Sequence, residues 1–314
     1  SGHFRTSELT NYSLSSFRAP WLPMHRAVLG VTLAAVVVGA VPPHGSFGAR
    51  HPAIDEGITN GFVGGYSMDV YWQRRLSSAG GFYIFTDRNN HRVQKCPAAS
   101  PGSDCTTVAG TGGRGSGPTQ LYYPQGIALD AAGDYLIVDA YNHRVQKCPA
   151  ASPGSDCTTV AGTGGTGSGP TQLRFPYDIA LDAGGDYLIV DSQNNRVQTC
   201  PAASPGAACT TVAGTNRGSG PKQLSYPKGI AFDAAGDYLI VDEYNHRVQK
   251  CPAAAPGSAC TTVAATGFQG SGSSQLQRPY AIELDAAGDY LIADRVNHRV
   301  QKCPAASPGA ACTT

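Results

Sequence analysis

The chain has 314 residues, of which 14% are charged, and its net charge is +1. So small a net charge generates no global field that would attract nucleic acid or a membrane surface. Glycine (39) and proline (22) make the chain rich in turns. Strand-like runs of Ile, Val, Leu and Tyr recur between these turns, which argues against wholesale disorder.

The first predicted element is an apolar run at residues 27–41, AVLGVTLAAVVVGAV. Met24, His25 and Arg26 precede it, and small residues follow it as far as Ala49. A short basic start followed by an apolar stretch predicts a secretory signal peptide over 24–49. A short membrane anchor and a buried helix are the alternatives, although the run is shorter than the ~20 residues that a spanning helix prefers.

The remaining residues before the repeats give little structural information. Residues 1–23 are unassigned, and they lie upstream of the natural start if that start is Met24. Residues 50–78 show no clear period and are interpreted as a linker of unknown structure. Arg74–Ser78 (RRLSS) occupies the place where the first repeat would have its first strand, so we expect that strand to be missing.

Residues 79–314 repeat one unit with a period of 51 or 52 residues. In the unit that runs from 124 to 162, four strand-like segments alternate with turns. Four short antiparallel strands in about 50 residues are typical of one blade of a β-propeller, whereas the rungs of a β-solenoid are usually shorter. The predicted fold is therefore all-β, a propeller of about five four-stranded blades. The four expected strands of this unit cover residues 126–130, 135–139, 143–148 and 157–162.

The ten cysteines form five identical C-x8-C frames with none left over. This even count favours disulfides within each unit and an oxidising compartment, so we expect an extracellular or membrane-anchored protein of the secretory pathway. Zinc is the alternative, but its ligands usually have tighter spacing. A disulfide here would close the hairpin between the third and fourth strands and stiffen the outer edge of the blade. The expected pairs are Cys96/Cys105, Cys148/Cys157, Cys200/Cys209, Cys251/Cys260 and Cys303/Cys312.

The repeated pattern P-x-G-I-A-L-D…Y-L-I-V-D-x-x-N-H-R-V-Q resembles the NHL-repeat family of β-propellers. The matching tripeptide is Asn-His-Arg in four units and Asn-Asn-Arg at 194–196. This resemblance implies protein-binding and RNA-binding roles, as in some members, and a ring that often closes with six blades. It also implies an enzymatic alternative, because similar propellers such as amidating lyases use channel-lining residues and metal. The cysteine pairs and the Pro-Ala-Ser loops depart from the family pattern.

An Asp and an Arg lie five residues apart in every unit, on either side of one tight turn. A carboxylate and a guanidinium at this spacing can form a bidentate pair, so we interpret them as a structural latch. A catalytic carboxylate would more plausibly be unique than present five times. The latch residues are Asp87/Arg92, Asp139/Arg144, Asp191/Arg196, Asp242/Arg247 and Asp294/Arg299.

The histidines beside these arginines occupy equivalent positions in different units, which favours a structural role over a metal site. They are His91, His143, His246 and His298, and Asn195 takes the remaining place. The turns with the sequence Asp130-Ala-Ala-Gly-Asp134 lack the spacing of an EF-hand calcium loop. The repeats contain none of the G-x-S-x-G, H-E-x-x-H or phosphate-loop motifs. We therefore expect no catalytic residues, no metal and no cofactor.

The near-identical units differ at a few positions before the first strand and after YLIVD. Because strand direction alternates, these positions are predicted to share one rim of the propeller, and loops on such a rim commonly carry binding. Aromatic and arginine side chains suit protein hot spots and also single-stranded nucleic acid. Drift at unconstrained loops is the alternative explanation. The predicted rim residues are Arg88, Tyr122, Tyr141, Arg174, Tyr177, Lys228, Tyr244, Arg278, Tyr280 and Arg295, set against Glu243.

From the sequence alone, we expect a non-enzymatic scaffold that binds a protein or peptide through this rim. The alternatives are an RNA-binding module and a propeller enzyme of the amidating-lyase or lactonase kind. A membrane partner is expected only if residues 27–41 are an anchor. The sequence does not determine the ligand or the oligomeric state.

Overall fold

The structure is a computed structural model that describes residues 75–77, 81–98, 104–163 and 165–314. The signal peptide expected over 24–49, the segment 1–23 and all of 50–78 except three residues lie outside this described part. In the described part, no helix is both long and apolar enough to cross a membrane.

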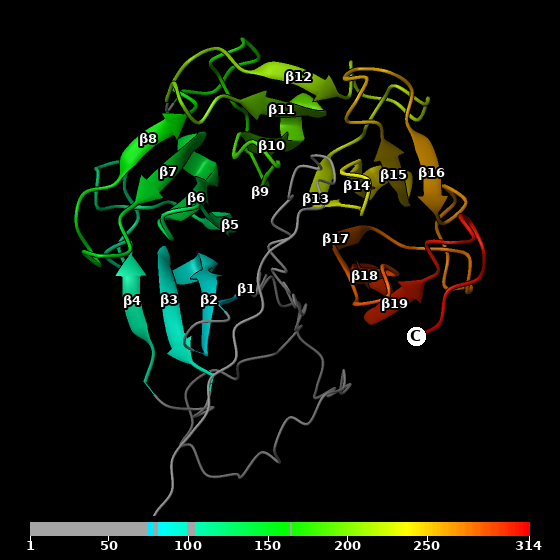
Figure 1. Cartoon of the computed structure of the whole chain (residues 1–314), viewed down its shortest axis with the longest axis horizontal. Helices are drawn as coiled ribbons and strands as arrows, with labels where there is room; N and C mark the ends of the chain where they lie inside the picture. Colours follow the sequence, from blue (N-terminus) through cyan, green and yellow to red (C-terminus); the bar gives the residue numbers. More distant parts are fainter. Residues whose placement is uncertain (1–74, 78–80, 99–103, 164) are drawn as a thin grey trace, which may run out of the picture. The chain divides into compact units, whose positions relative to one another are not determined.

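The described residues form five antiparallel sheets arranged around a common centre, with β5, β9, β13 and β17 innermost (Figure 1). Blade 1 contains β1 (Arg75–Ser77), β2 (Phe82–Asp87), β3 (Arg92–Pro97) and β4 (Thr106–Ala109). Blade 2 contains β5 (Pro124–Leu129), β6 (Tyr135–Asp139), β7 (Arg144–Cys148) and β8 (Thr158–Ala161). Blade 3 contains β9 (Ile179–Leu181), β10 (Tyr187–Asp191), β11 (Arg196–Cys200) and β12 (Thr210–Ala213). Blade 4 contains β13 (Pro227–Phe232), β14 (Tyr238–Asp242), β15 (Arg247–Cys251) and β16 (Thr261–Ala264). Blade 5 contains β17 (Pro279–Leu284), β18 (Tyr290–Asp294) and β19 (Arg299–Cys303).

The predicted propeller is confirmed, with two differences at the ends of the repeat array. Arg75–Ser77 does form a first strand, because it pairs with Phe82–Ile84 of β2. The expectation that blade 1 lacks this strand was therefore wrong. Blade 5 has three strands, and a single bridge between Lys302 and Thr313 takes the place of the fourth.

Blades 2 to 4 each contribute a fully buried second strand, which explains its continuous apolar sequence. All five residues of β6 are buried, as expected for a strand covered on both faces. The turn before it is closed by Asp130, whose Oδ1 accepts hydrogen bonds from the amides of Ala132 and Asp134. Gly133 has φ +85° in this turn, a conformation that favours glycine.

The hydrophobic core consists of separate clusters, each formed between two neighbouring blades. One cluster joins Leu136 and Val138 of blade 2 to Ile179 and Tyr187 of blade 3. The disulfide between Cys200 and Cys209 lies in the same cluster. Burial of apolar surface between blades therefore determines how each blade packs on the next.

The five predicted disulfides are present with the expected pairing. The first cysteine of each pair lies in the third strand of its blade, and the chain returns to it after a loop of eight residues. The bonds are Cys96–Cys105, Cys148–Cys157, Cys200–Cys209, Cys251–Cys260 and Cys303–Cys312.

The second cysteine of each pair lies outside the fourth strand, which corrects the expected strand boundary. The strand expected to start at Cys157 starts at Thr158 instead, because the Cys157 amide donates to the Pro118 carbonyl of the preceding linker and not to β7. The amides of the later second cysteines also donate to the linker before their blade. These cysteines and their acceptors are Cys209 with Pro170, Cys260 with Pro221 and Cys312 with Ser273. Cys105 likewise directly precedes β4.

The disulfide loops also lie differently from the expected outer edge, because each described loop of blades 2 to 5 docks on the preceding blade. In blade 3, the amide of Gly206 donates to the Val160 carbonyl at 2.8 Å, and the amide of Cys209 donates to the Pro170 carbonyl at 2.8 Å. The disulfide therefore stabilises a contact between blades as well as its own hairpin.

The predicted Asp–Arg latch is present in every blade, with a geometry that is not bidentate. In blade 2, the Nε of Arg144 donates to Oδ2 of Asp139 at 2.8 Å. The NH2 nitrogen of Arg144 donates instead to the carbonyls of Gly117 and Gln120 in the preceding linker. The latch therefore connects a blade to the linker that leads into it.

The Asp139 carboxylate is the centre of this arrangement. It is completely buried, and it accepts hydrogen bonds from the Tyr122 amide at 2.7 Å, from Asn142 at 2.8 Å and from Arg144. Burial raises the pKa of Asp139, and these three donors oppose that shift. The carboxylate thus holds together the end of β6, the following 3₁₀ turn, the start of β7 and the segment that leads into β5.

We predict that Asp139→Ala lowers the free energy of unfolding by about 3–5 kcal/mol, because it leaves Arg144 buried without its partner. Asp87→Ala in blade 1 is the matched control, since the Asp87 side chain is 22% exposed and so has less effect on its Arg. Urea unfolding of both variants measures the difference. Equal losses for the two variants would contradict this account.

Removal of one disulfide by Cys200→Ser with Cys209→Ser is expected to cost about 2–3 kcal/mol, because a short closed loop restricts the unfolded chain. Peptide mapping without reduction checks the pairing, and urea unfolding measures the loss. Cross-links between cysteines of different blades would show that the pairing is wrong.

Candidate functional site

The rim predicted from the sequence corresponds to one face of the propeller, which we call the 3₁₀ face. It carries the 3₁₀ turns η1 (Arg88–Asn90), η2 (Ala140–Asn142), η3 (Ser192–Asn194), η4 (Glu243–Asn245) and η5 (Arg295–Asn297). The segments that lead into the inner strands lie beside these turns, because Pro124 pairs with Asp139 and the Tyr141 amide donates to the Tyr122 carbonyl. The disulfide loops and the Asp-x-x-Gly-Asp turns lie at the opposite ends of the strands, on what we call the disulfide face.

Four aromatic side chains form a continuous row on the 3₁₀ face across blades 2 and 3. The ring centroids of Tyr122 and Tyr123 are 5.2 Å apart, those of Tyr123 and Tyr141 are 4.8 Å apart, and those of Tyr141 and Phe175 are 4.9 Å apart. The guanidinium of Arg88 lies 4.6 Å from the centre of the Tyr123 ring. Tyr141 is 39% exposed, so this row presents aromatic surface to a partner.

A second aromatic group occupies the same face between blades 4 and 5. The rings of Tyr226 and Tyr244 are 4.8 Å apart. Arg278 lies 4.5 Å from the centre of the Tyr244 ring, and Arg217 lies 5.1 Å from that of Tyr226. Tyr244 is 40% exposed. Both groups therefore combine exposed tyrosine with arginine.

The centre of the 3₁₀ face is formed by residues that follow the proline opening each inner strand. Lys228 of blade 4 lies with its Nζ 3.7 Å from the centre of the Tyr177 ring and 3.7 Å from Oε2 of Glu243. Tyr177 and Tyr280 come from the blades on either side, and their rings are 5.0 Å apart. Side chains from three blades therefore meet at one point.

This central group is electrostatically unusual. Burial is the main cause that lowers the pKa of Lys228 to about 8, with a further lowering by the charges of Arg295 and Arg88. Glu243 opposes this shift, and burial raises the pKa of the Glu243 carboxyl itself. The arrangement places one cation and one anion in a low-dielectric environment lined by tyrosine.

The histidines hold the aromatic rim from the preceding blade. Nδ1 of His143 accepts a hydrogen bond from the Phe175 amide at 3.1 Å, and Nδ1 of His91 accepts one from the Tyr123 amide at 3.2 Å. Phe175 has φ +45° and Tyr123 has φ +49°, a left-handed conformation that non-glycine residues rarely adopt. In the next blade, Oδ1 of Asn195 makes the same contact with the Tyr226 amide. These contacts support the structural role expected for the histidines.

The predicted rim residues all lie on the 3₁₀ face, but the structure groups them unequally. Tyr177, Lys228, Tyr280 and Arg295 surround the centre, whereas the others lie around it. Arg174 lies beside His143 and lowers its pKa. The sequence analysis missed Tyr123, Phe175 and Tyr226 as rim residues. The available signal was an aromatic residue directly before the proline in three of four units.

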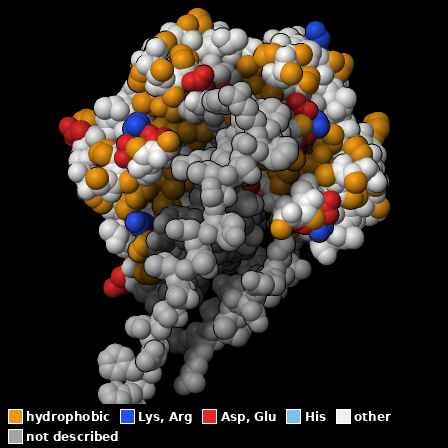
Figure 2. Space-filling view, in the orientation of Figure 1, with side chains coloured by type: hydrophobic (Ala, Val, Ile, Leu, Met, Phe, Trp, Pro, Cys, Tyr) orange, Lys and Arg blue, Asp and Glu red, His pale blue; other side chains and the backbone are white. Residues whose placement is uncertain are grey.

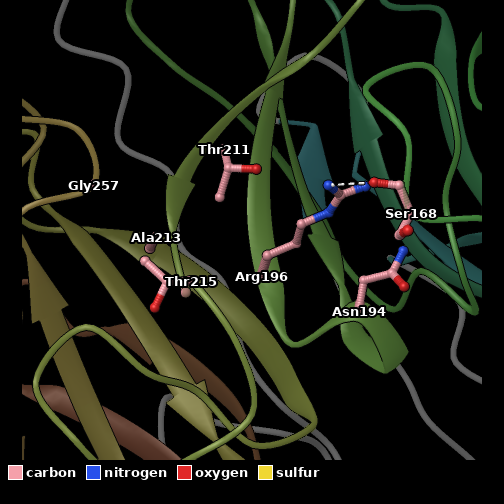
Figure 3. A pocket seen from close by; sticks show the side chains of 8 residues that line it. Ser168, Asn194, Arg196, Thr211, Ala213, Thr215 and Gly257 are labelled. Carbon is pink, nitrogen blue, oxygen red and sulfur yellow. Dashed lines mark hydrogen bonds between the residues drawn. The ribbon is translucent and has the colours of Figure 1, made fainter.

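A separate hollow of about 460 Å³ is lined by Asn194 of η3, by the outer strands of blade 3 and by the disulfide loop of blade 4 (Figure 3). Figure 3 shows Arg196 extending toward Ser168, whose carbonyl accepts a hydrogen bond from it at 2.9 Å. Its polar lining therefore consists partly of latch residues that already have partners. Among the described residues, no group of three His, Cys, Asp or Glu side chains is placed to hold a metal ion.

In blades 2, 4 and 5, charges on the disulfide face are neutralised within the blade. Nζ of Lys147 lies 2.6 Å from Asp130 and 3.3 Å from Asp134, and the equivalent groups recur in blades 4 and 5. A space-filling view of one side of the molecule shows acidic and basic side chains in small separate groups with hydrophobic side chains between them (Figure 2). The 3₁₀ face differs, because there the arginines lie over aromatic rings.

The sheet arrangement and the repeated latch define the class of protein, which is a β-propeller. Residues 121–148 and 224–251 match the NHL repeat. Two of its blades therefore contain a segment that matches the NHL repeat.

Comparison with curated proteins gives relatives of two kinds. NHL repeat-containing protein 3 of Mus musculus is 29% identical over 153 residues, which are 45% of this chain and 39% of that protein. Peptidyl-alpha-hydroxyglycine alpha-amidating lyase 2 of Drosophila melanogaster is 33% identical over 143 residues, which are 45% of this chain and 34% of that protein. The chain thus matches less than half the length of each of these relatives.

Solved structures support the fold. A putative gluconolactonase has a TM-score of 0.53 at 15% identity, covering 73% of this chain and 72% of its own. An auxiliary nutrient binding protein from Bacteroides thetaiotaomicron has a TM-score of 0.53 at 16% identity, covering 71% of this chain and 56% of its own.

The histidine contacts predict that the stability of the fold depends on pH. Asn195, which stands where the other blades have histidine, provides the comparison. Burial lowers the pKa of His143 below its ordinary value of 6.5, so the folded state binds fewer protons than the unfolded state. The contribution of His143 is therefore complete above pH 6.5 and is lost as the pH falls through its folded pKa. We expect His143→Asn, which copies Asn195, to reduce the loss of stability between about pH 7 and pH 5.

Urea unfolding of the wild-type chain and of His143→Asn across this range measures the effect. An identical pH slope in both proteins would contradict the proposed neutral histidine contact.

Proposed function

We propose that this propeller is a binding module for a protein or peptide. It binds an acidic segment that also contains tyrosine, through the 3₁₀ face. The observation that carries the proposal is the pairing of exposed tyrosines with arginines in two groups around that face. Arginine and tyrosine are the residues that most often dominate protein-binding surfaces.

The repeat supports this assignment by an internal comparison. The latch, the disulfides and the buried strands are nearly the same in every blade, whereas the side chains of the 3₁₀ face differ. Arg88, Arg278 and Arg295 lie over tyrosine rings, and such stacking leaves guanidinium N–H groups able to donate to carboxylates. An acidic peptide therefore fits this face better than a basic one.

The five disulfides favour a ligand in an oxidising environment. We accordingly propose that the chain acts in the secretory pathway or outside the cell. RNA is a weaker candidate for this reason, although arginine and aromatic side chains also suit single strands.

An enzymatic function is the second candidate, and the amidating lyase and a peptidylglycine alpha-amidating monooxygenase of Rattus norvegicus among the relatives favour it. These relatives match this chain over less than half of its length. The binding proposal rests instead on the described side chains themselves, so it is the one to test first.

The test uses the full chain and fluorescein-labelled poly(Glu,Tyr), with poly-Glu and oligouridylate as alternative probes. We expect poly(Glu,Tyr) to bind most tightly by fluorescence anisotropy and to weaken with added salt. Arg278→Ala is expected to weaken this binding about tenfold, which corresponds to about 1.4 kcal/mol. Tyr141→Ala with Tyr244→Ala should reduce binding of poly(Glu,Tyr) more than binding of poly-Glu.

Lys302→Ala is the charge-matched control, because it removes one positive charge from the disulfide face and should leave binding unchanged. Preferential binding of oligouridylate would assign the face to RNA and overturn the proposal. Failure of both glutamate polymers to bind would also overturn it, and turnover in a lyase or lactonase assay would then support the enzymatic candidate.

A further inference from the structure

Lys228 differs from the other lysines of the chain in how its amine is held. Nζ of Lys147 and Nζ of Lys250 each lie between two aspartates, with a closest approach of 2.6 Å and 2.5 Å, and these contacts raise the pKa of both amines. Among the described residues, the ion-pair partner of Lys228 is Glu243, whose Oε2 lies 3.7 Å from Nζ, beyond ordinary hydrogen-bond distance. Its amine is therefore less firmly held as an ammonium ion.

The surroundings of Lys228 favour the neutral amine further. Its side chain is only 13% exposed; the rings of Tyr177 and Tyr280, whose centres lie 3.7 Å and 5.6 Å from Nζ, contribute to this burial, although their faces attract a cation. Arg295, whose guanidinium lies 5.3 Å from the centre of the Tyr280 ring, adds positive charge on the same side. A buried lysine next to cations is the usual environment of an amine that acts as a nucleophile.

Two buried polar atoms belong to residues of blades 2 and 3 that occupy the repeat positions held by Lys228 and Glu243 in blade 4. Gln125 follows the proline that opens the inner strand of blade 2, as Lys228 does in blade 4, and its Oε1 has no hydrogen-bond partner in the described part of the chain. Ser192 occupies in blade 3 the position of Glu243 in blade 4, and its Oγ is likewise without a partner there. Buried polar atoms normally have partners, so these atoms indicate that the centre accommodates a polar ligand.

We propose that Lys228 condenses reversibly with the carbonyl carbon of a small 2-oxo acid bound at the centre of the 3₁₀ face. The carboxylate of such a ligand would pair with the arginine charge contributed by Arg295 and Arg88. Its carbonyl would lie at Nζ, between the tyrosine rings and the Glu243 carboxyl. No redox step is involved.

The bonds change in two steps. The lone pair of the neutral Nζ attacks the carbonyl carbon and a C–N bond forms as the C=O π bond breaks; Glu243 takes one proton from the nitrogen and delivers it to the oxygen, which gives a hydroxyl. The hydroxyl then leaves as water with a second proton, which Glu243 relays from solvent, and the nitrogen lone pair forms the C=N bond of a protonated imine. Glu243 suits both proton transfers, because its raised pKa is closer to the neutral range in which general acids and bases work best.

Imine formation at Lys228 and peptide binding by the rim share Arg88 and Arg295, but variants of other residues distinguish the failure of one proposal from the failure of the other. Tyr141 and Tyr244 lie in the outer aromatic groups, so Tyr141→Ala with Tyr244→Ala should leave imine formation at Lys228 unchanged. Lys228→Arg keeps the positive charge and forms no imine with a ketone or aldehyde, so it should abolish labelling at position 228.

The test is reductive trapping on the full chain with glyoxylate and sodium cyanoborohydride, followed by peptide mass spectrometry. At pH 7, about a tenth of an amine with a pKa near 8 is neutral, against less than a thousandth for an ordinary lysine. We therefore expect Lys228 to acquire the carboxymethyl group at least about tenfold faster than Lys147, which serves as the internal control. Its rate should rise with pH and level off above about 8.

Glu243→Gln distinguishes a role of Glu243 in proton transfer from a purely structural role, because only the former changes both the pH midpoint and the maximal rate of labelling. Loss of the carboxylate should lower the pH midpoint of labelling, because Glu243 raises the pKa of Lys228, and should reduce the maximal rate by at least about tenfold, because the general acid is lost. Equal or faster labelling of Lys147 or Lys222, or total labelling unchanged in Lys228→Arg, would overturn the proposal.

Discussion

The carboxylate at the end of the second strand, which is completely buried in blades 2 to 5, is the interaction on which the rest of the molecule depends. A bare carboxylate would be costly to bury, so Asp139 and its equivalents require donors from three directions. These donors are a backbone amide before the inner strand, the Asn of the 3₁₀ turn and the Arg that starts the third strand. Satisfying one charge therefore places every segment that forms the 3₁₀ face.

The blades are held to one another by contacts that also come from the repeated framework. The Arg of each described latch in blades 2 to 5 reaches the linker before it, and the disulfide loop docks on the blade before it. The His or Asn after each of the first four 3₁₀ turns holds the aromatic or arginine residue of the following blade in a left-handed conformation. The variable side chains are thus presented from a rigid backbone, which limits the entropy lost when a ligand binds.

The sequence was sufficient for features whose partners lie close together in the chain. The Asp–Arg spacing of five residues and the C-x8-C frames each predicted a contact across one turn or hairpin, and these contacts are present. Contacts between blades could not be predicted in the same way. The meeting of Tyr177, Lys228 and Tyr280 depends on the packing angle between blades, and the docking of Gly206 on Val160 depends on register across two sheets.

The difference between blades at the centre has a physical reason. The position after the proline recurs in blades 2 to 5, so four identical copies would bring identical side chains to the centre of the 3₁₀ face. Four lysines there would repel one another strongly in a low-dielectric environment. With Gln125, Tyr177, Lys228 and Tyr280 at these positions, the centre instead contains one lysine with one nearby carboxylate, Glu243. A repeat that is uniform in its framework can therefore form a chemically distinct site only where its copies differ, and the centre of the 3₁₀ face is the place where this difference brings side chains into contact.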